Sequence, residues 1–188
     1  MTTILGIGGT LRPGSSSELA LRHALAVAAA CGADVEMLTA TDLTFPMYDP
    51  ERGAPTPAVD AFLAAVRRAD GVIVASPSYH GGISGLLKNA FDYLQELAAD
   101  PAPYLDGRAV GCVVTAAGWQ AGVATLLALR STVHALRGWP TPMGVVLNSA
   151  DRPFDADGQP RDPKARAQLT TLGEQVARFP HGLLAPAA

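Results

Sequence analysis

The sequence has few cysteines and no obvious metal ligands. Its 188 residues include two cysteines, Cys31 and Cys112, which stand far apart and show no spacing typical of metal ligands. Two isolated cysteines also do not make a disulfide framework of the kind that stabilises small secreted domains. We therefore expect no bound metal and a reducing, cytoplasmic environment.

Charge of either sign is also sparse. The 14 lysine and arginine residues and the 17 aspartate and glutamate residues give a net charge of −3, and they are dispersed along the chain. Without a basic patch, nucleic acid is not an expected partner. The first residues lack a charged leader before an apolar core, so we expect no signal peptide.

One uncharged run, residues 109–129, is long enough to span a bilayer. Polar residues and glycines interrupt this run, and its first part is rich in β-branched residues whereas its last part has helical character. We predict a buried strand, a loop and a helix here, and no membrane partner.

Glycines and hydroxyl-bearing residues are concentrated in residues 4–18. A short apolar strand ends in a small-residue loop, and an Ala/Leu-rich helical run follows. The unpaired N–H groups and the dipole of a helix start attract anions. Ser15 followed by Glu18 predicts a capping box. Together these features predict a phosphate cradle made by the hydroxyls of Thr10, Ser15, Ser16 and Ser17 and the guanidinium of Arg12.

This loop departs from two well-known phosphate motifs. Ser15 stands where a Walker loop requires lysine, which argues against nucleotide hydrolysis. Gly6 and Gly8 begin a dinucleotide fingerprint, but Leu11 occupies the place of its third glycine. The hydroxyl groups and the single arginine of this loop suit one terminal monophosphate. The alternative is an ordinary glycine-rich turn between a strand and a helix.

The hydrophobic pattern alternates between strand and helix five times. Strands are expected at 3–7, 34–38, 71–75, 108–115 and 144–147, and helices at 17–31, from 57 onward, at 85–98, at 122–137 and at 163–178. Alternation with fully apolar central strands predicts an α/β fold with a parallel sheet and helices on both faces. We expect a single domain over residues 1–180 and a loose tail at 181–188.

The order of strands decides where a ligand binds. In a five-stranded parallel sheet of order 2-1-3-4-5, ligands bind beyond the carboxyl ends of the first and third strands, and the typical ligand is FMN. The segments after the third and fourth strands, 76–82 and 116–120, each combine an aromatic residue with glycines. Such loops suit a flat ring with a polar edge.

Two segments resemble the NAD(P)H-dependent FMN reductase family. Residues 9–15 are similar to its Gly-Ser-x-Arg-x-x-Ser loop, and residues 76–90 to its second signature, Thr-Pro-Glu-Tyr-Asn-Gly-Ser-x-Pro-Gly-x-Leu-Lys-Asn-Ala. This resemblance implies a flavodoxin-like fold and bound FMN. It also implies NADPH or NADH as cosubstrate, a flavin, quinone or similar acceptor, and a homodimer or homotetramer.

The resemblance also implies the site residues. The phosphate loop would hold FMN through Thr10, Arg12, Ser15 and Ser17, and the flavin ring would lie along Pro77, Ser78, Tyr79, His80 and Gly81, with Gly118 and Trp119 nearby. Ser78, His80 and Trp119 replace the glutamate, asparagine and glycine that are common in the family. No catalytic side chain is expected, because the cofactor carries the hydride chemistry.

Several alternatives remain at this point. A flavodoxin-type electron carrier is disfavoured by Arg12 and by the modest negative charge. A flavoenzyme acting on a dedicated metabolite would use Ser78, His80 and Trp119 as its pocket. Trp119 also suits a packing position or an interface, and Tyr79 could cap the sheet edge. Surplus apolar residues at 85–98 and 122–137 favour a homo-oligomer with FMN near the interface.

Overall fold

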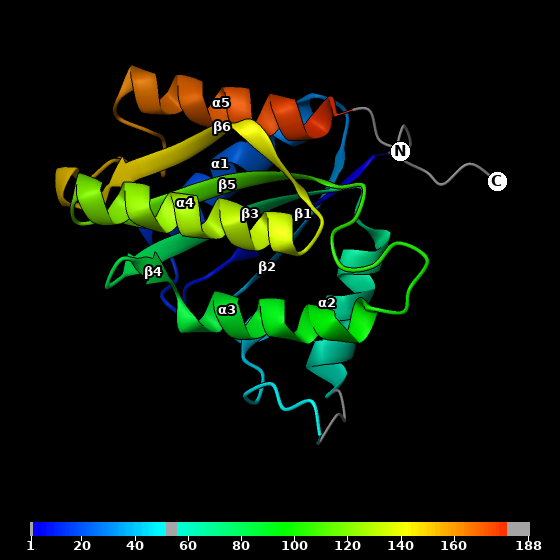
Figure 1. Cartoon of the computed structure of the whole chain (residues 1–188). Coiled ribbons are helices and arrows are strands. Elements are labelled where there is room, and N and C mark those ends of the chain that lie inside the picture. The colour runs from blue at the N-terminus through cyan, green and yellow to red at the C-terminus, as the bar shows by residue number, and fades with distance from the viewer. Residues whose placement is uncertain (1, 52–55, 180–188) are drawn as a thin grey trace.

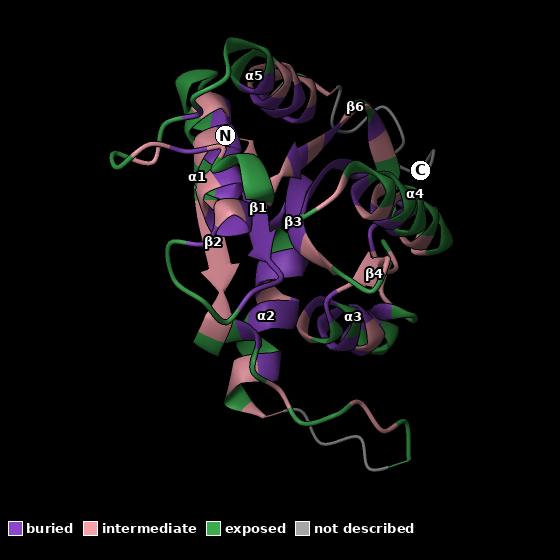
Figure 2. Ribbon diagram, turned by 90° about the vertical axis from the view of Figure 1, so that its left-hand side faces the viewer, coloured by how far each residue is buried: buried purple, intermediate pink, exposed green. Residues whose placement is uncertain are grey.

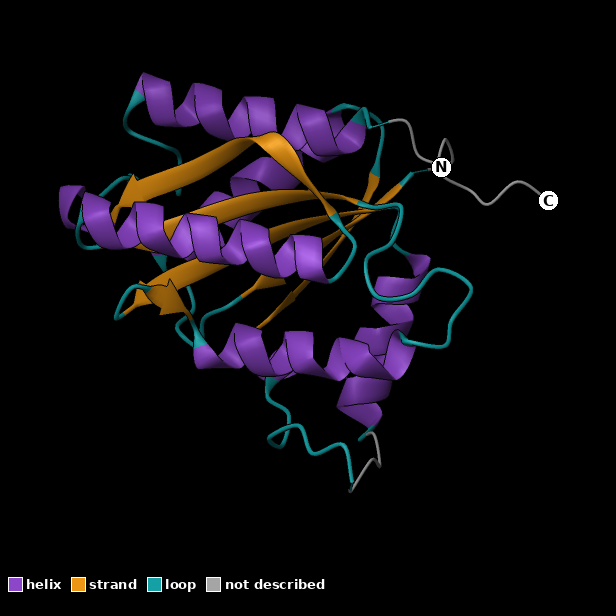
Figure 3. Cartoon of the chain, in the orientation of Figure 1, coloured by secondary structure: helices purple, strands orange, loops and turns teal. Residues whose placement is uncertain are grey.

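The computed structural model describes residues 2–51 and 56–179, which form a sheet between two layers of helices (Figures 1 and 3). Five parallel strands run in the order β2-β1-β3-β5-β6, which in chain order is the predicted 2-1-3-4-5. Their bounds are β1 Thr3–Gly8, β2 Asp34–Thr39, β3 Gly71–Tyr79, β5 Ala109–Ala116 and β6 Trp139–Asn148. The α/β fold and its sheet order are therefore confirmed.

The helices divide between the two faces of this sheet. One face is covered by α1 (Ser16–Ala30) and α5 (Pro163–Ala177), and the other by α2 (Pro57–Arg68), α3 (Gly85–Asp92) and α4 (Trp119–Ala135). Short 3₁₀ turns η1 (Ala40–Leu43), η2 (Tyr93–Leu97) and η3 (Ser149–Asp151) follow β2, α3 and β6. The apolar run at 109–129 forms β5, a loop and the first part of α4, as predicted.

Alternating side chains of the central strands pack into two separate hydrophobic cores. In β3, Val72 and Val74 pack toward α2 and α3, whereas Ile73 and Ala75 pack toward α1 and α5. Both faces of the strand are therefore buried, which Figure 2 shows as the purple centre of the molecule. This double burial explains why the central strands read as continuous apolar runs rather than as alternating patterns.

The expected end of the third strand at residue 75 is wrong. The strand continues to Tyr79 and then turns back as β4 (Gly82–Ile83), which pairs with it antiparallel. His80 and Gly81 make the two-residue turn, with φ angles of 53° and 80°. Positive φ at both central positions is the type I′ geometry that suits hairpin twist.

Three other boundaries differ from expectation. The last strand begins at Trp139 rather than 144, because an edge strand tolerates prolines that a central strand would not. The helix expected at 85–98 is α3 followed by the 3₁₀ turn η2, and α4 begins three residues early, at Trp119.

The tail expected at 181–188 lies outside the described residues. None of the helices in the described part of the chain has both the length and the apolar character of a membrane span.

Candidate functional site

The segments singled out in the sequence meet at the carboxyl end of the sheet. The N–H of Gly9, just after β1, donates to the carbonyl of Ala75 in β3 at 2.8 Å. On the other side of β3, Pro77 pairs in register with Thr115 of β5. The phosphate loop, the β3–β4 hairpin and the loop after β5 are therefore neighbours, as the strand order requires.

Gly9 allows the phosphate loop to pass close to the start of α3. A Cβ at this position would lie 2.8 Å from Ser84 Oγ, 3.1 Å from Leu87 Cβ and 3.3 Å from the Ala75 carbonyl oxygen. Ser84 caps α3, since its Oγ accepts from Leu87 N at 3.2 Å. Only glycine fits this approach without moving the loop or the helix start.

Hydroxyl groups are packed into the phosphate loop. Ser15 is the N-cap of α1, and its Oγ accepts from Glu18 N at 3.3 Å and lies 3.2 Å from Ser17 Oγ. Thr10 Oγ1 accepts from Arg12 N at 3.1 Å. Thr10, Ser15 and Ser17 are buried, whereas Arg12 is exposed at the rim.

The donor set of this loop fits a phosphate monoester. Within residues 2–51 and 56–179, no acceptor pairs with the backbone N–H of Ser16 or Ser17 in the first turn of α1. These N–H groups lie at the positive end of the helix dipole. With the neighbouring hydroxyls and the guanidinium of Arg12, they supply what a phosphate dianion requires.

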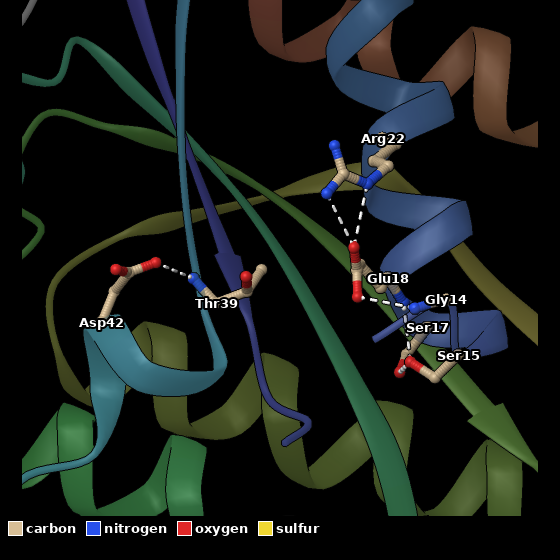
Figure 4. Close-up of polar contacts among 7 residues, drawn as sticks. All are labelled: Gly14, Ser15, Ser17, Glu18, Arg22, Thr39 and Asp42. Carbon is tan, nitrogen blue, oxygen red and sulfur yellow. Dashed lines mark hydrogen bonds and ion pairs between the residues drawn. The ribbon is translucent and has the colours of Figure 1, made fainter. Parts of the chain in front are cut away.

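The predicted capping box is only half correct. Ser15 receives Glu18 N as expected, but the Glu18 carboxylate accepts from Gly14 N at 3.0 Å instead of returning to Ser15 (Figure 4). Its other oxygen accepts from Arg22 Nε at 2.9 Å and Nη2 at 2.7 Å. Gly14 has a φ of 66°, a left-handed conformation that favours glycine.

The hairpin after β3 carries the residues predicted to line the flavin ring. Tyr79 is 58% exposed and His80 is exposed, so both side chains are free at the tip of the hairpin. Ser78 instead faces α4, because its hydroxyl donates to the Ala121 carbonyl at 3.3 Å and lies 2.7 Å from Thr125 Oγ1. The Ser78 hydroxyl therefore ties the hairpin to the first turns of α4.

Trp119 begins α4 directly after Gly118 and is 58% exposed. It lines a cavity of about 550 Å³ bounded by α4, β6 and the segment leading into α5. The cavity has an apolar wall that includes Leu126 and Val146, and its rim includes Arg161 and Lys164. The structure thus brings Trp119 to the β6 side of the site, and its contact with flavin stays a prediction.

Two side-chain contacts near the site were not anticipated from the sequence. Thr125 is fully buried under the hairpin, although nothing in its spacing distinguishes it from other residues of α4. Asn89 of α3 accepts from Tyr48 N at 2.9 Å and donates to the Pro46 carbonyl at 2.9 Å, which fixes the segment after η1. The signal available in the sequence was an asparagine next to apolar positions in the helix expected at 85–98.

Cys112 is a packing residue rather than a reactive thiol. It lies in the middle of β5, and burial raises the pKa of its thiol to about 12, so the thiolate is not formed at neutral pH. Among the described residues, no group of three histidine, cysteine, aspartate or glutamate side chains could hold a metal ion.

Comparison with known proteins identifies relatives over most of the chain. Residues 2–152 match the family model described as NADPH-dependent FMN reductase. An NAD(P)H-dependent FMN reductase of Pseudomonas aeruginosa is 32% identical over 184 residues, which cover 94% of this chain and 96% of that protein. A quinone reductase of Escherichia coli is 29% identical over 180 residues, with 90% and 93% covered.

A solved structure shows the same fold. FerB, a flavoenzyme NAD(P)H:(acceptor) oxidoreductase from Paracoccus denitrificans, superposes with a TM-score of 0.77 at 18% identity, and the match covers 97% of this chain and all of that one. At this identity the likeness is one of fold alone. The family match, by contrast, spans the phosphate loop, the hairpin and α4. This chain belongs to the NADPH-dependent FMN reductase family.

Proposed function

We propose that this protein is an FMN-containing oxidoreductase that takes hydride from NADPH or NADH and passes the electrons to a flavin, a quinone or a similar small acceptor. The observation that carries the proposal is the phosphate loop at the start of α1, where the N–H groups of Ser16 and Ser17 have no acceptor among the described residues and lie beside buried hydroxyls. Membership of the FMN reductase family and relatives named as FMN and quinone reductases support it.

Different segments of the site would bind different parts of FMN. Thr10, Arg12 and Ser15–Ser17 would hold the phosphate of FMN, and the main chain of Pro77–Gly81 and of Gly118 would lie along the flavin ring. When bound, FMN supplies the hydride chemistry itself. The chain would contribute orientation and main-chain dipoles, and Tyr79 would cover part of the ring. Reducing substrate and acceptor would use the same space in turn, which gives ping-pong kinetics.

Flavin titration tests this function directly. Because the loop is built for one terminal phosphate, FMN should bind more tightly than riboflavin or FAD when flavin fluorescence is followed. Equal affinity for riboflavin would contradict the phosphate assignment. Oxidation of NADPH and NADH by the FMN-loaded protein, measured against free FMN, a quinone and an azo dye, then identifies the acceptor class.

A second candidate function is reduction or oxidation of a dedicated metabolite. The cavity beside Trp119 favours it, because about 550 Å³ with apolar walls and a few polar side chains is typical of a small-molecule site. This candidate predicts turnover with one acceptor and little with the others, whereas the first predicts broad turnover across the panel.

We also infer a single cytoplasmic FMN-binding domain over residues 1–180 that assembles as a homodimer or homotetramer. The two cores share one sheet, which supports a single domain. On α4, Val123 is 49% and Leu127 64% exposed, one helical turn apart and in line with Trp119. The surplus apolar residues expected on α3 are instead largely buried in the core, so α4 is the better candidate interface.

A further inference from the structure

Glu18 places a negative charge directly beside the phosphate loop. The residue is buried, only 7% exposed, and its carboxylate lies in the first turn of α1, three residues after the N-cap Ser15. One oxygen accepts from Gly14 N at 3.0 Å, and the other accepts from both Nε and Nη2 of Arg22 (Figure 4). The carboxylate therefore joins the phosphate loop to the second turn of the helix.

Such a carboxylate has two opposite effects on an incoming phosphate. By accepting from Gly14 it holds the left-handed turn that leads the chain into Ser15 and the first helical N–H groups. Its negative charge, however, repels a phosphate dianion that occupies the same helix end. Arg22 can cancel this repulsion, because its guanidinium contacts the carboxylate at 2.7 Å while its own side chain is 61% exposed.

We propose that Glu18 and Arg22 are positioning residues for the FMN phosphate: Glu18 fixes the Gly14 turn, and Arg22 neutralises the Glu18 carboxylate so that the loop accepts a dianion. The proposal rests on the proposed function, in that the phosphate loop must bind FMN. It assigns to Arg22 an effect on phosphate affinity, although Arg22 projects from the second turn of α1 and is separate from the predicted phosphate ligands.

The simpler interpretation is an ordinary ion pair that only stabilises the helix. Pairs at this spacing on an exposed helix contribute little to stability, and they have no reason to distinguish one flavin from another. The two interpretations therefore differ in a measurable way. A positioning pair changes the affinity for FMN and leaves that for riboflavin, which has no phosphate, nearly unchanged.

The test is a double-mutant cycle read by flavin fluorescence titration with FMN and riboflavin. Arg22→Ala leaves the Glu18 carboxylate uncompensated and should weaken FMN binding about tenfold, with riboflavin binding changed by less than about twofold. Glu18→Gln keeps an acceptor for Gly14 and removes the charge, so the double variant should recover FMN affinity to within about threefold of the parent. Arg22→Lys keeps the positive charge and should bind FMN nearly as the parent does.

Glu174 of α5 and Arg178, the residue that follows α5, provide the matched control, because they form an i,i+4 pair at 3.6 Å on the surface. Glu174→Gln and Arg178→Ala should change neither flavin affinity. Equal loss of FMN and riboflavin binding in Arg22→Ala, or no recovery in the double variant, overturns this proposal alone. A parent protein that binds riboflavin as tightly as FMN overturns the phosphate site and this proposal with it.

Discussion

At the scale of single residues, Arg12 is the first test of the phosphate loop. It is exposed at the rim of the loop, so Arg12→Ala should leave the fold intact. A charge-assisted contact to phosphate contributes about 1.5–3 kcal/mol, and its loss should weaken FMN binding by roughly 10- to 100-fold. Fluorescence titration measures the affinity and thermal unfolding checks the fold. An unchanged affinity would place Arg12 in solvent.

Substitution of Gly9 tests whether the close approach of the loop to α3 contributes to stability and to FMN binding. Gly9→Ala puts a Cβ 2.8 Å from Ser84 Oγ, so the loop must shift, and we expect a loss of about 1–3 kcal/mol in the free energy of unfolding. FMN binding should weaken as well, since the shifted segment leads into the phosphate loop. Gly85→Ala is the control, because nothing lies within 4 Å of a Cβ there. Equal behaviour of the two variants would contradict the steric explanation.

Substitution of Trp119 distinguishes a role in the substrate pocket from a role in packing. With 58% of its surface exposed, Trp119→Ala should lower the free energy of unfolding by well under the 3–5 kcal/mol typical of a buried aromatic. FMN should stay bound, and kcat/KM for the acceptor half-reaction should change, most for large acceptors. Stopped-flow absorbance resolves the two half-reactions. Unchanged rates in both would remove Trp119 from the substrate pocket.

At the scale of elements, the hairpin after β3 depends on α4 for its position. Thr125→Val removes a buried hydroxyl that lies 2.7 Å from Ser78 Oγ and keeps the side-chain shape. We expect a loss of about 0.5–1.5 kcal/mol, because one hydrogen bond is removed while the Ser78 hydroxyl keeps the Ala121 carbonyl as a partner. Denaturant unfolding measures this change, and amide exchange should become faster in the hairpin. Thr132→Val on the same helix is the control, because the hydroxyl of this half-buried residue donates to the Ala128 carbonyl of its own helix and does not contact the hairpin.

The elements also show what could be predicted from the sequence. The strand–loop–helix course from β1 to α1 was predictable because the capping serine, the small residues and the apolar strand all agree locally. The β3–β4 hairpin was not, since its turn needs a positive φ at His80, which is uncommon outside glycine. The contact of Glu18 with Gly14 depends on the shape of the turn, and a sequence pattern of capping residues does not encode it.

At the scale of the whole molecule, the exposed face of α4 predicts assembly. Light scattering at micromolar concentration should give a dimer or tetramer, and Leu127→Glu should shift it toward a monomer without unfolding it, because Leu127 is 64% exposed. Ala167→Glu on α5, on the opposite side of the sheet, should leave the assembly unchanged. A monomeric parent protein would contradict the inferred homo-oligomer.

The sheet order was predictable at this scale because parallel strands with short helical crossovers leave few topologies. The division of apolar residues between core and surface was not. The same helical spacing of apolar residues occurs in α3 and α4, yet the first is largely buried between the sheet and its neighbours and the second leaves Val123 and Leu127 exposed. Tertiary packing, rather than periodicity, decides which apolar face remains uncovered.

The hydrogen bond from Gly9 to Ala75 has a consequence for folding kinetics. It joins segments 66 positions apart in the sequence, so the phosphate loop reaches its final shape only after β1 and β3 have paired. Contacts of such large sequence separation form late, since a long loop must first be closed. We therefore expect flavin capture to be a late event during refolding, with no stabilisation by the cofactor of a partly folded chain in which only α1 has formed. Ligand present in excess then stabilises only the completed sheet.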